Sequence, residues 1–457
     1  MSLEEEVARL RSENEALQEQ LHRVQQELAA ALERLTELEQ QVRKSAVPFK
    51  PSRPSRSGEK PPRRARAAEA NRGRKRGKPT RVVKHALERC PTCSYRLRGE
   101  SIVRRREVIE LPPPPPVEVI EHQVIKRWCP HCECWQQPRL DLRGQVLGQG
   151  RMGVRLASLM AYLRTELRLP VRCISGYLET VHGLRLSAGE VVELLHHVQQ
   201  ALAGAVAAVH GQVQASPVVQ ADETGWREEG QNGYLWTFST PDPEGVRYYT
   251  YDPRRSGEVV ERVLGEDFRG HLVSDFYAAY NRYPGPHQRC WVHLLRDLHE
   301  LKEAHPEDAQ ALNWAQEVRS LYEQAQRFLS TPDPPSREAR ERKYAELVEQ
   351  VDPLGLQFAP AAFKKHPCWA LCKRLLRHRD ELFQFVRVEG LPAHNNLAER
   401  SLRPLVVMRK ISGGTRSPRG SRTRMALASL LGTWRARGLN PFQECFQLLS
   451  QTPLPYF

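Results

Sequence analysis

The feature that most constrains the fold is a stretch of short predicted strands between residues 217 and 293. Runs rich in β-branched and aromatic residues, bounded by turn residues, are typical of strands. The runs lie at 218–222, 234–239, 246–251 and 271–275, and a predicted helix over 257–264 precedes the last one. Three antiparallel strands, a helix and a parallel fourth strand together predict one mixed sheet.

Two of the predicted strands end in a carboxylate, Asp222 and Asp275. This order of elements is the ribonuclease-H-like layout, in which the first and fourth strands are neighbours, so we expect the two side chains to lie side by side. Carboxylate oxygens are suitable ligands for hard divalent cations. Two such ions about 4 Å apart can serve a phosphodiester displacement, for which a third carboxylate is still needed.

Ten cysteines are present, and four of them form two CxxC pairs, Cys90 with Cys93 and Cys129 with Cys132. Two such pairs can place four thiolates around one structural Zn²⁺, whereas a disulfide framework is not expected in a reducing compartment. Polar and β-branched runs over 103–109 and 117–125 predict strands between the pairs, joined by a stiff run of five prolines. His131 and Cys134 are alternative ligands, and four reduced cysteines without metal are the alternative to the site.

Residues 1–42 carry an apolar heptad repeat with Asn14 at one core position. Such a repeat predicts a coiled coil, and a single buried Asn favours two parallel chains in register. A lone amphipathic helix packing on its own chain is the alternative.

Residues 43–85 contain sixteen Lys or Arg and two Glu, in a chain whose net charge is +15. A segment so basic, and rich in Pro, Ser and Gly, cannot bury apolar surface and predicts a disordered arm that attracts polyanions. Within it, a hook that could enter the minor groove of DNA is formed by Arg72, Arg74, Lys75 and Arg76. Generic phosphate attraction by a solvated linker is the alternative.

Three helical patterns follow between residues 151 and 210, the last capped by Ser187. They predict a helix-turn-helix-like region or a connecting bundle. The chain has no run of eighteen apolar residues, and its N-terminus does not resemble a signal peptide. We therefore expect a soluble intracellular protein, cytoplasmic and associated with the nucleoid when bound to DNA, without a membrane partner.

The run from His394 to Pro404, with Glu399 at its centre, completes a recognisable set of motifs. Together with the motifs at 222–224 and 274–280, it makes the chain resemble the transposases of the IS66 insertion-sequence family over nearly its whole length. The resemblance implies that Asp222, Asp275 and Glu399 are a DDE triad holding two Mg²⁺ or Mn²⁺ ions. The step of 124 residues between the last two acids implies a helical insertion, for which helices are predicted at 309–328 and 337–350.

Two neighbours of the triad are weaker candidates. Glu223 follows Asp222 directly, and adjacent strand residues point to opposite faces of a sheet. His293 follows a predicted fifth strand and is predicted either to orient a phosphate or water or to be a buried structural histidine.

Basic residues gather beside Glu399, and Arg403, one turn beyond it, could orient its carboxylate or meet the scissile phosphate. A Gly-rich run at 412–414 could let backbone amides approach DNA, and no Walker-type lysine pattern is present. The basic candidates for DNA contact are Arg400, Arg403, Arg409 and Lys410, followed by Arg416, Arg419, Arg422 and Arg424.

The prediction is thus a multidomain α+β protein. Its segments are a coiled-coil dimerisation segment (1–42), a basic arm (43–85), a zinc-ribbon-like module (86–140), a helix-turn-helix-like region (145–212), the first part of a ribonuclease-H-like, or retroviral-integrase-like, catalytic core (213–295), a helical insertion (296–390), and the rest of that core with a tail (391–457).

The resemblance implies a DNA transposase that cleaves strands at element ends and transfers them into target DNA. Its implied partners are terminal repeats, target DNA, a second copy of the chain through the coiled coil, and accessory proteins of the same element. Two alternatives remain open: a DNA-binding regulator or domesticated transposase without catalysis, and a nuclease that cuts without joining.

Overall fold

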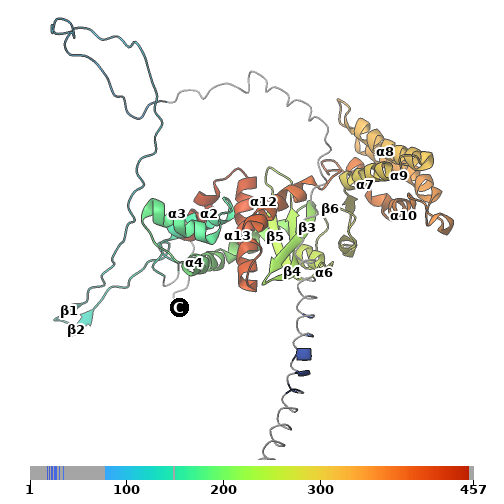
Figure 1. Ribbon diagram of the computed structural model, residues 1–457, viewed down its shortest axis with the longest axis horizontal. Helices are drawn as coiled ribbons and strands as arrows, with labels where there is room; N and C mark the ends of the chain where they lie inside the picture. The colour runs from blue at the N-terminus through green and yellow to red at the C-terminus, as the bar shows by residue number, and fades with distance from the viewer. Residues whose placement is uncertain are drawn as a thin grey trace, which may run out of the picture. The chain divides into compact units, whose positions relative to one another are not determined.

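The computed structural model describes residues 78–147, residues 150–451 and nine helical positions between 18 and 34. The chain divides into two units, Met1–Leu111 and Pro112–Phe457, and each is described by itself. In the described part of the chain, no helix combines the length and apolar character needed to cross a membrane. The second unit combines helices with two sheets, as predicted for an α+β protein (Figure 1).

Most of the predicted coiled coil over 1–42 and of the basic arm over 43–85 lies outside the described residues. The same holds for the four residues of the predicted minor-groove hook, Arg72, Arg74, Lys75 and Arg76. Both segments therefore stay predictions.

The two cysteine pairs lie in tight turns. In the first unit, the backbone N–H of Ser94 donates to the carbonyl oxygen of Cys90 over 2.8 Å. In the second unit, the antiparallel strands β1 (Arg127–Cys129) and β2 (Cys134–Gln136) form a hairpin that pairs Cys129 with Cys134. The strands predicted at 103–109 and 117–125 are wrong. These runs are exposed and irregular, since their apolar side chains have no facing surface to cover, and Val103 is 97% exposed.

Four helices precede the large sheet: α2 (Val154–Thr165), α3 (Val171–His182), α4 (Ala188–Ala201) and α5 (Ala203–Gln214). The predicted cap at Ser187 is confirmed. Its side chain accepts a hydrogen bond from the backbone of Glu190, whose carboxylate accepts one from the backbone of Ser187, and this reciprocal pair satisfies two free N–H groups of α4.

The large sheet has the order β5-β4-β3-β6-β7. It contains β3 (Val218–Glu228), β4 (Gln231–Ser239), β5 (Arg247–Asp252), β6 (His271–Ser274) and β7 (His287–Arg289), with α6 (Glu258–Leu264) before β6. The strands β3, β4 and β5 are antiparallel, and β6 runs parallel to β3, as the sequence predicted.

One predicted boundary is wrong, because β3 does not end at Asp222 but continues to Glu228. β4 is also longer than predicted, and it pairs with β3 as far as the two-residue turn that joins the two strands. Both turn residues, Glu229 and Gly230, have positive φ (51° and 80°), and such turns match the twist of a hairpin. Asp222 therefore lies inside a strand.

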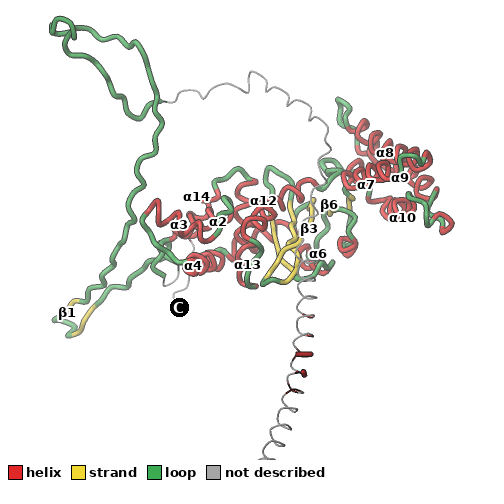
Figure 2. Tube along the Cα trace, in the orientation of Figure 1, coloured by secondary structure: helices red, strands yellow, loops and turns green. Residues whose placement is uncertain are grey.

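Each face of this sheet packs against different helices (Figure 2). Trp226, Leu235 and Tyr249 join a core with residues of α12 (Asn396–Ser412) and α13 (Pro418–Ala436). On the opposite face, Val219, Ala221, Trp236 and Phe238 pack with α6 and with Tyr280 of the 3₁₀ helix η2 (Ala278–Arg282). Even-numbered residues of β3 thus face α12, and odd-numbered ones face away from it. The C-terminal helix α14 (Pro441–Gln451) packs on α2.

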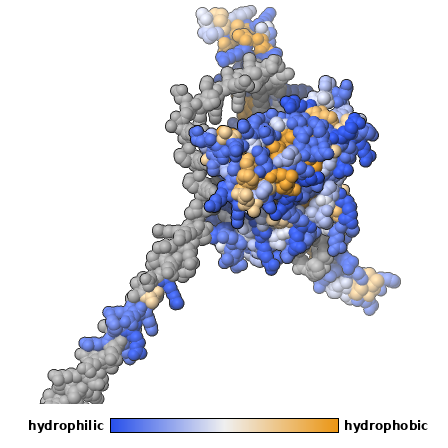
Figure 3. Space-filling model, turned by 90° about the vertical axis from the view of Figure 1, so that its right-hand side faces the viewer, coloured by the Kyte–Doolittle hydropathy of each residue, from blue (hydrophilic) through white to orange (hydrophobic). Residues whose placement is uncertain are grey.

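Between β7 and α12 the chain forms a helical insertion whose hydrophobic core also takes in Val273 of β6. It consists of α7 (Trp291–Ala304), α8 (Ala309–Leu329), α9 (Arg337–Gln357), η3 (Ala361–Phe363), α10 (Trp369–His378), η4 (Arg379–Glu381) and α11 (Gln384–Arg387). The helices predicted at 309–328 and 337–350 are confirmed as α8 and α9. Figure 3 looks onto this side of the molecule, where apolar residues form a patch within a largely hydrophilic surface.

Candidate active site

Asp222 and Asp275 come from neighbouring parallel strands. The last paired residues of β3 and β6 are Gln220 and Val273, so the same register continued by two residues brings Asp222 opposite Asp275. Asp275 follows the end of β6, and one of its carboxylate oxygens accepts a hydrogen bond from the backbone N–H of Tyr277 over 2.9 Å. The side-by-side placement expected from the sequence is therefore supported by the register.

The start of α12 is bound directly to β3. The Asn395 side-chain amide donates to the carbonyl oxygen of Ala221 over 2.7 Å, and the Leu397 N–H donates to the side chain of Gln220 over 3.2 Å. Glu399 lies in the first turn of this helix, where the helix dipole favours a negative charge. These two bonds bring a residue 124 positions beyond Asp275 to the strand that carries Asp222.

Polar atoms near Glu399 are buried without partners. Its Oε1 atom makes no hydrogen bond, and the Nε2 atom of His293 lies 3.7 Å away from it. The Nδ1 atom of His293 and the side-chain oxygen of Asn395 are also buried and unsatisfied. Because a buried polar atom without a partner is costly, this cluster is suited to receiving a ligand that supplies the missing interactions.

The carboxylates also perturb one another. Burial, followed by the charges of Glu223, Asp275 and Glu399, raises the pKa of Asp222 to about 8. A cation bound among these groups would offset their repulsion. Within the described ranges, no three His, Cys, Asp or Glu side chains already converge in a metal-coordinating group.

Glu223 faces the other side of the sheet, as strand alternation predicts. Both of its carboxylate oxygens are occupied, one by Arg255 over 2.9 Å and the other by the hydroxyl of Tyr280. Only 2% of its side chain is exposed. Glu223 is therefore held in a network of its own behind Asp222.

A buried arginine that the sequence analysis missed supports Asp275 from the insertion side. Arg289 is fully buried and donates to the backbone carbonyl of Asp275 over 2.9 Å. Its Nε pairs with Glu381 of η4 at 2.5 Å, and His378 pairs with the same carboxylate oxygen at 3.0 Å. Although burial opposes it, these partners lower the pKa of Glu381 to about 2. No local pattern links Arg289 with Glu381, since 92 positions separate them.

The predicted DNA contacts divide into several kinds. Arg400, Arg403, Lys410, Arg416 and Arg422 are exposed, and Arg403 does not hold the unsatisfied oxygen of Glu399.

Other basic residues of this group are engaged inside the fold. Arg409 is half-buried and donates to Thr224 of β3 over 3.3 Å. Arg419 pairs with Glu193 of α4 at 2.8 Å, and Arg424 contacts the sulfur of Met408 over 2.6 Å.

The Gly-rich run after α12 has a packing role. A Cβ atom on Gly414 would stand 1.7 Å from the carbonyl oxygen of Arg227, so only glycine fits there. The next residue, Thr415, donates its N–H to the same carbonyl over 2.8 Å. The glycine at 414 is thus explained by close approach to β3 rather than by DNA.

The four predicted zinc ligands fall in different units: Cys90 and Cys93 in the first, Cys129 and Cys132 in the second. Hydrogen bonds from the backbone of Cys93 and Thr92 lower the pKa of the Cys90 thiol. Those from Cys132 and His131 likewise lower the pKa of Cys129. Each turn therefore favours a thiolate, the form that binds metals.

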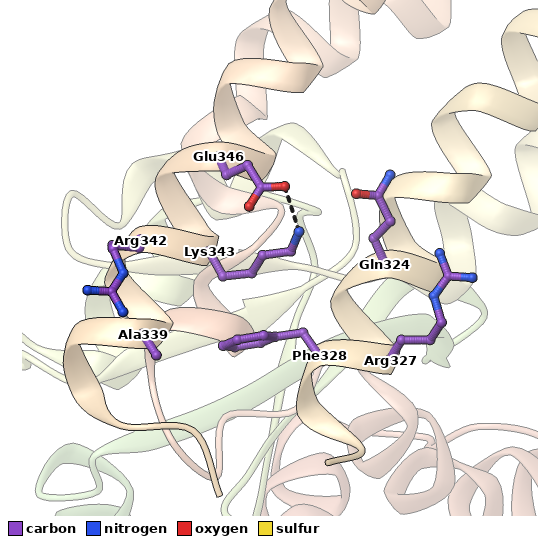
Figure 4. A pocket seen from close by; sticks show the side chains of 7 residues that line it. All are labelled: Gln324, Arg327, Phe328, Ala339, Arg342, Lys343 and Glu346. Atoms are coloured by element: carbon purple, nitrogen blue, oxygen red, sulfur yellow. Dashed lines mark hydrogen bonds and ion pairs between the residues drawn. The ribbon is translucent and has the colours of Figure 1, made fainter.

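A surface pocket lies elsewhere, in the helical insertion (Figure 4). It opens between α8 and α9, and its lining includes Arg327, Arg342 and an ion pair of 2.7 Å between Lys343 and Glu346. None of the three predicted carboxylates lines it, so the chemistry is to be sought at the sheet.

Two curated relatives, both from Sinorhizobium fredii, match parts of the chain. The uncharacterised protein y4jO is 30% identical over 156 residues, covering 34% of this chain and 46% of the relative. The uncharacterised protein y4qI is 24% identical over 236 residues, covering 48% of this chain and 43% of the relative. The chain therefore spans less than half the length of each of these relatives.

A protein-family model also matches the chain, and over a longer stretch than either relative. The model of the family described as "Transposase IS66 family" matches residues 149–423, from the helices before the sheet to the start of α13. This match includes Asp222, Asp275 and Glu399 and extends over more than half of the chain. The chain belongs to the IS66 transposase family.

Proposed function

We propose that this chain is a DDE-type DNA transposase that cleaves strands at element ends and joins them to target DNA. The observation that carries the proposal is that burial and the charges of Glu223, Asp275 and Glu399 together raise the pKa of Asp222 to about 8. Family membership supports the transposase role, and this acidic cluster supports the chemistry.

The sheet supports a ribonuclease-H-like catalytic core. Its order, with three antiparallel strands and two parallel ones beyond β3, is the layout inferred from the strand pattern. The insertion between β7 and α12 leaves this layout intact, because both of its ends are anchored there. The Trp291 N–H donates to the carbonyl oxygen of Ala393 over 3.0 Å.

The donor set fits two divalent cations such as Mg²⁺ or Mn²⁺. Asp222, Asp275 and Glu399 would hold them, and the unsatisfied Oε1 of Glu399 is a free ligand atom. When bound, such ions activate the attacking oxygen and stabilise the leaving oxygen of a phosphodiester displacement. Carboxylate oxygens are the ligands that these cations prefer.

The protein's own groups would position the reactants. Asn395 and Gln220 fix the start of α12, and Arg289 fixes the backbone of Asp275. His293, which contacts Glu399, would orient a water molecule or a phosphate oxygen through its unsatisfied Nδ1 atom. Both hydrolysis and strand joining need the attacking oxygen to approach the same phosphorus in line.

Recognition and assembly belong to the other segments in this proposal. One structural Zn²⁺ would be held by Cys90, Cys93, Cys129 and Cys132, and the lowered thiol pKa values of Cys90 and Cys129 favour the thiolate form at those two positions. The helices α2 to α5 would contribute to end recognition, the basic arm to phosphate attraction and the coiled coil to pairing of two chains.

The test uses the DNA ends that flank the gene, presented as labelled duplexes together with a target plasmid. We expect Mg²⁺-dependent cleavage and joined products from the unaltered chain. Asp222→Asn, Asp275→Asn and Glu399→Gln should each lower cleavage at least a thousandfold while end binding persists, because each removes ligand charge and leaves the DNA-contacting segments.

Asp267→Asn, an exposed change outside the strands, serves as the matched control and should cleave normally. Robust Mg²⁺-dependent cleavage by any of the three variants would refute the assignment. Cleavage without joined product, under conditions in which paired ends form, would instead identify a nuclease.

A further inference from the structure

Arg255 is held by contacts with two side chains, Glu223 and Tyr277. It lies in the loop after β5, and its Nε donates to Glu223 over 2.9 Å. Its guanidinium lies 3.8 Å from the ring centre of Tyr277, whose hydroxyl donates to the carbonyl oxygen of Arg255 over 2.7 Å. A planar guanidinium fixed at one edge and one face loses little further entropy when it binds a ligand.

One edge of this guanidinium remains open. Glu223 accepts from Nε and Nη2, which together form the side-on edge of the arginine. In the part of the chain that the structure describes, Nη1 makes no hydrogen bond, and 42% of the side chain is exposed. The end-on edge therefore keeps the N–H groups of Nη1 and the second N–H of Nη2 for a ligand, in the fork geometry that matches a phosphate.

Arg255 is linked to the predicted catalytic carboxylates through the two residues that it contacts, Tyr277 and Glu223. The Tyr277 that stacks on it binds the Asp275 carboxylate through its backbone N–H over 2.9 Å. The Glu223 that pairs with it directly follows Asp222 in β3. Glu223 points to the opposite face of the sheet from Asp222, and the charge of Asp275 is the one of the three predicted catalytic carboxylates that acts on Arg255. A strand whose cleaved phosphate reaches Asp275 would therefore bring a neighbouring phosphate within reach of this guanidinium.

The cost of burying Glu223 needs an explanation. Only 2% of the Glu223 side chain is exposed, and the residue directly follows Asp222 in β3. A carboxylate this close to a cluster of acids is unfavourable unless it serves its partners. Its partners are Tyr280 inside the fold and Arg255 at the surface.

Because Glu223 is buried, its pair with Arg255 also supports the fold. In addition, DNA that approaches several carboxylates needs a cation at their rim. The adjacent Arg254 is exposed, and its side chain makes no hydrogen bond or ion pair within the described residues. The fold thus fixes one of two neighbouring arginines and leaves the other unconstrained.

We propose that Arg255 binds a backbone phosphate of the DNA strand in the active site, next to the phosphate that is cleaved. Glu223 and Tyr277 act as positioning residues, because they hold the guanidinium with its open edge outward. This inference rests on the proposed function and adds a non-scissile phosphate subsite to it.

The test asks whether the Arg255 side chain and one particular phosphate contribute to DNA binding through the same contact. Duplexes from the flanking ends carry a single neutral methylphosphonate at successive positions around the cleaved bond. Binding is measured by fluorescence anisotropy with Ca²⁺ in place of Mg²⁺, and cleavage with Mg²⁺. Removing either the guanidinium or the phosphate charge from a bidentate pair should weaken binding about tenfold.

We expect one methylphosphonate position to weaken DNA binding by the unaltered chain about tenfold. The same methylphosphonate should weaken DNA binding by Arg255→Ala less than about twofold. Arg255→Lys should keep part of the sensitivity, and Glu223→Gln should reduce it by loosening the guanidinium. Arg254→Ala is the matched control and should respond as the unaltered chain does.

Three results would overturn the inference. They are equal methylphosphonate profiles for Arg255→Ala and the unaltered chain, a profile that disappears equally in Arg254→Ala, or a weakening of binding that is uniform across all positions. If the unaltered chain neither binds nor cuts these duplexes, the proposed function itself fails. Normal cutting with an Arg255-independent profile removes only the phosphate subsite.

Discussion

Replacing Asp222 should stabilise the metal-free protein while abolishing its chemistry. Burial and three neighbouring carboxylates raise the pKa of Asp222 from 3.8 to about 8. Between these values the native chain holds a proton that the unfolded chain releases, so the free energy of unfolding falls as pH rises. Asn is neutral at every pH, so the free energy of unfolding of Asp222→Asn should not fall with pH for this reason.

The magnitude follows from the size of the shift. Each pH unit within the window changes the difference in unfolding free energy by about 1.4 kcal/mol. The advantage of Asp222→Asn over the unaltered chain should therefore grow by roughly 3 kcal/mol between pH 5 and pH 7, and level off above the folded-state pKa of about 8.

Urea unfolding at pH 5, 6, 7 and 8 in EDTA measures this difference directly. Asp267→Asn, at an exposed position, should show no comparable growth. Added Mg²⁺ should stabilise the unaltered chain more than Asp222→Asn, because a bound cation offsets the repulsion only where the charge exists. A difference that stays constant from pH 5 to pH 8 would refute the account of the acidic cluster.

Three further predictions concern other parts of the chain. Glu381→Gln should lower the free energy of unfolding by about 3 kcal/mol in urea titrations at pH 7, because Arg289 is then buried without its carboxylate; an unchanged midpoint would show that the pair is dispensable. Elemental analysis should find about one Zn²⁺ per chain, absent from Cys90→Ser with Cys129→Ser but kept in the exposed control Cys173→Ser; zinc retained in the double variant would exclude these ligands. Segment 1–47 should sediment as a dimer, and Asn14→Ile should tighten its association while admitting trimers; a monomer at high micromolar concentration would remove the basis for pairing two chains.

Much of the sheet could be predicted because local pattern determines strands, and parallel pairing then determines neighbours. The register of β3 with β6 brought Asp222 and Asp275 together for the reason expected from the sequence. The end of β3 was missed, since its extension to Glu228 depends on a hairpin partner rather than on its own residues. The strands expected near Val103 do not form, because their local pattern is suitable but no partner strand or surface lies against them.

The third acid shows where local reasoning ends. Nothing in periodicity or spacing joins Glu399 to β3, and only the family motif supplied it. The structure gives the physical link through Asn395 and Gln220. The same limit hid Arg289 and its partner Glu381, because the meaning of a buried arginine depends on a carboxylate 92 positions away.

The helical insertion begins and ends at almost the same place, since the backbones of Trp291 and Ala393 are hydrogen-bonded to each other. Because that bond closes the entry and exit of the insertion, the number of residues between them has little effect on the distance from β7 to α12. Two insertion residues are tied to the site, namely His293 beside Glu399 and Glu381, which pairs with Arg289. Residues between these two points could be added or removed without relocating Glu399.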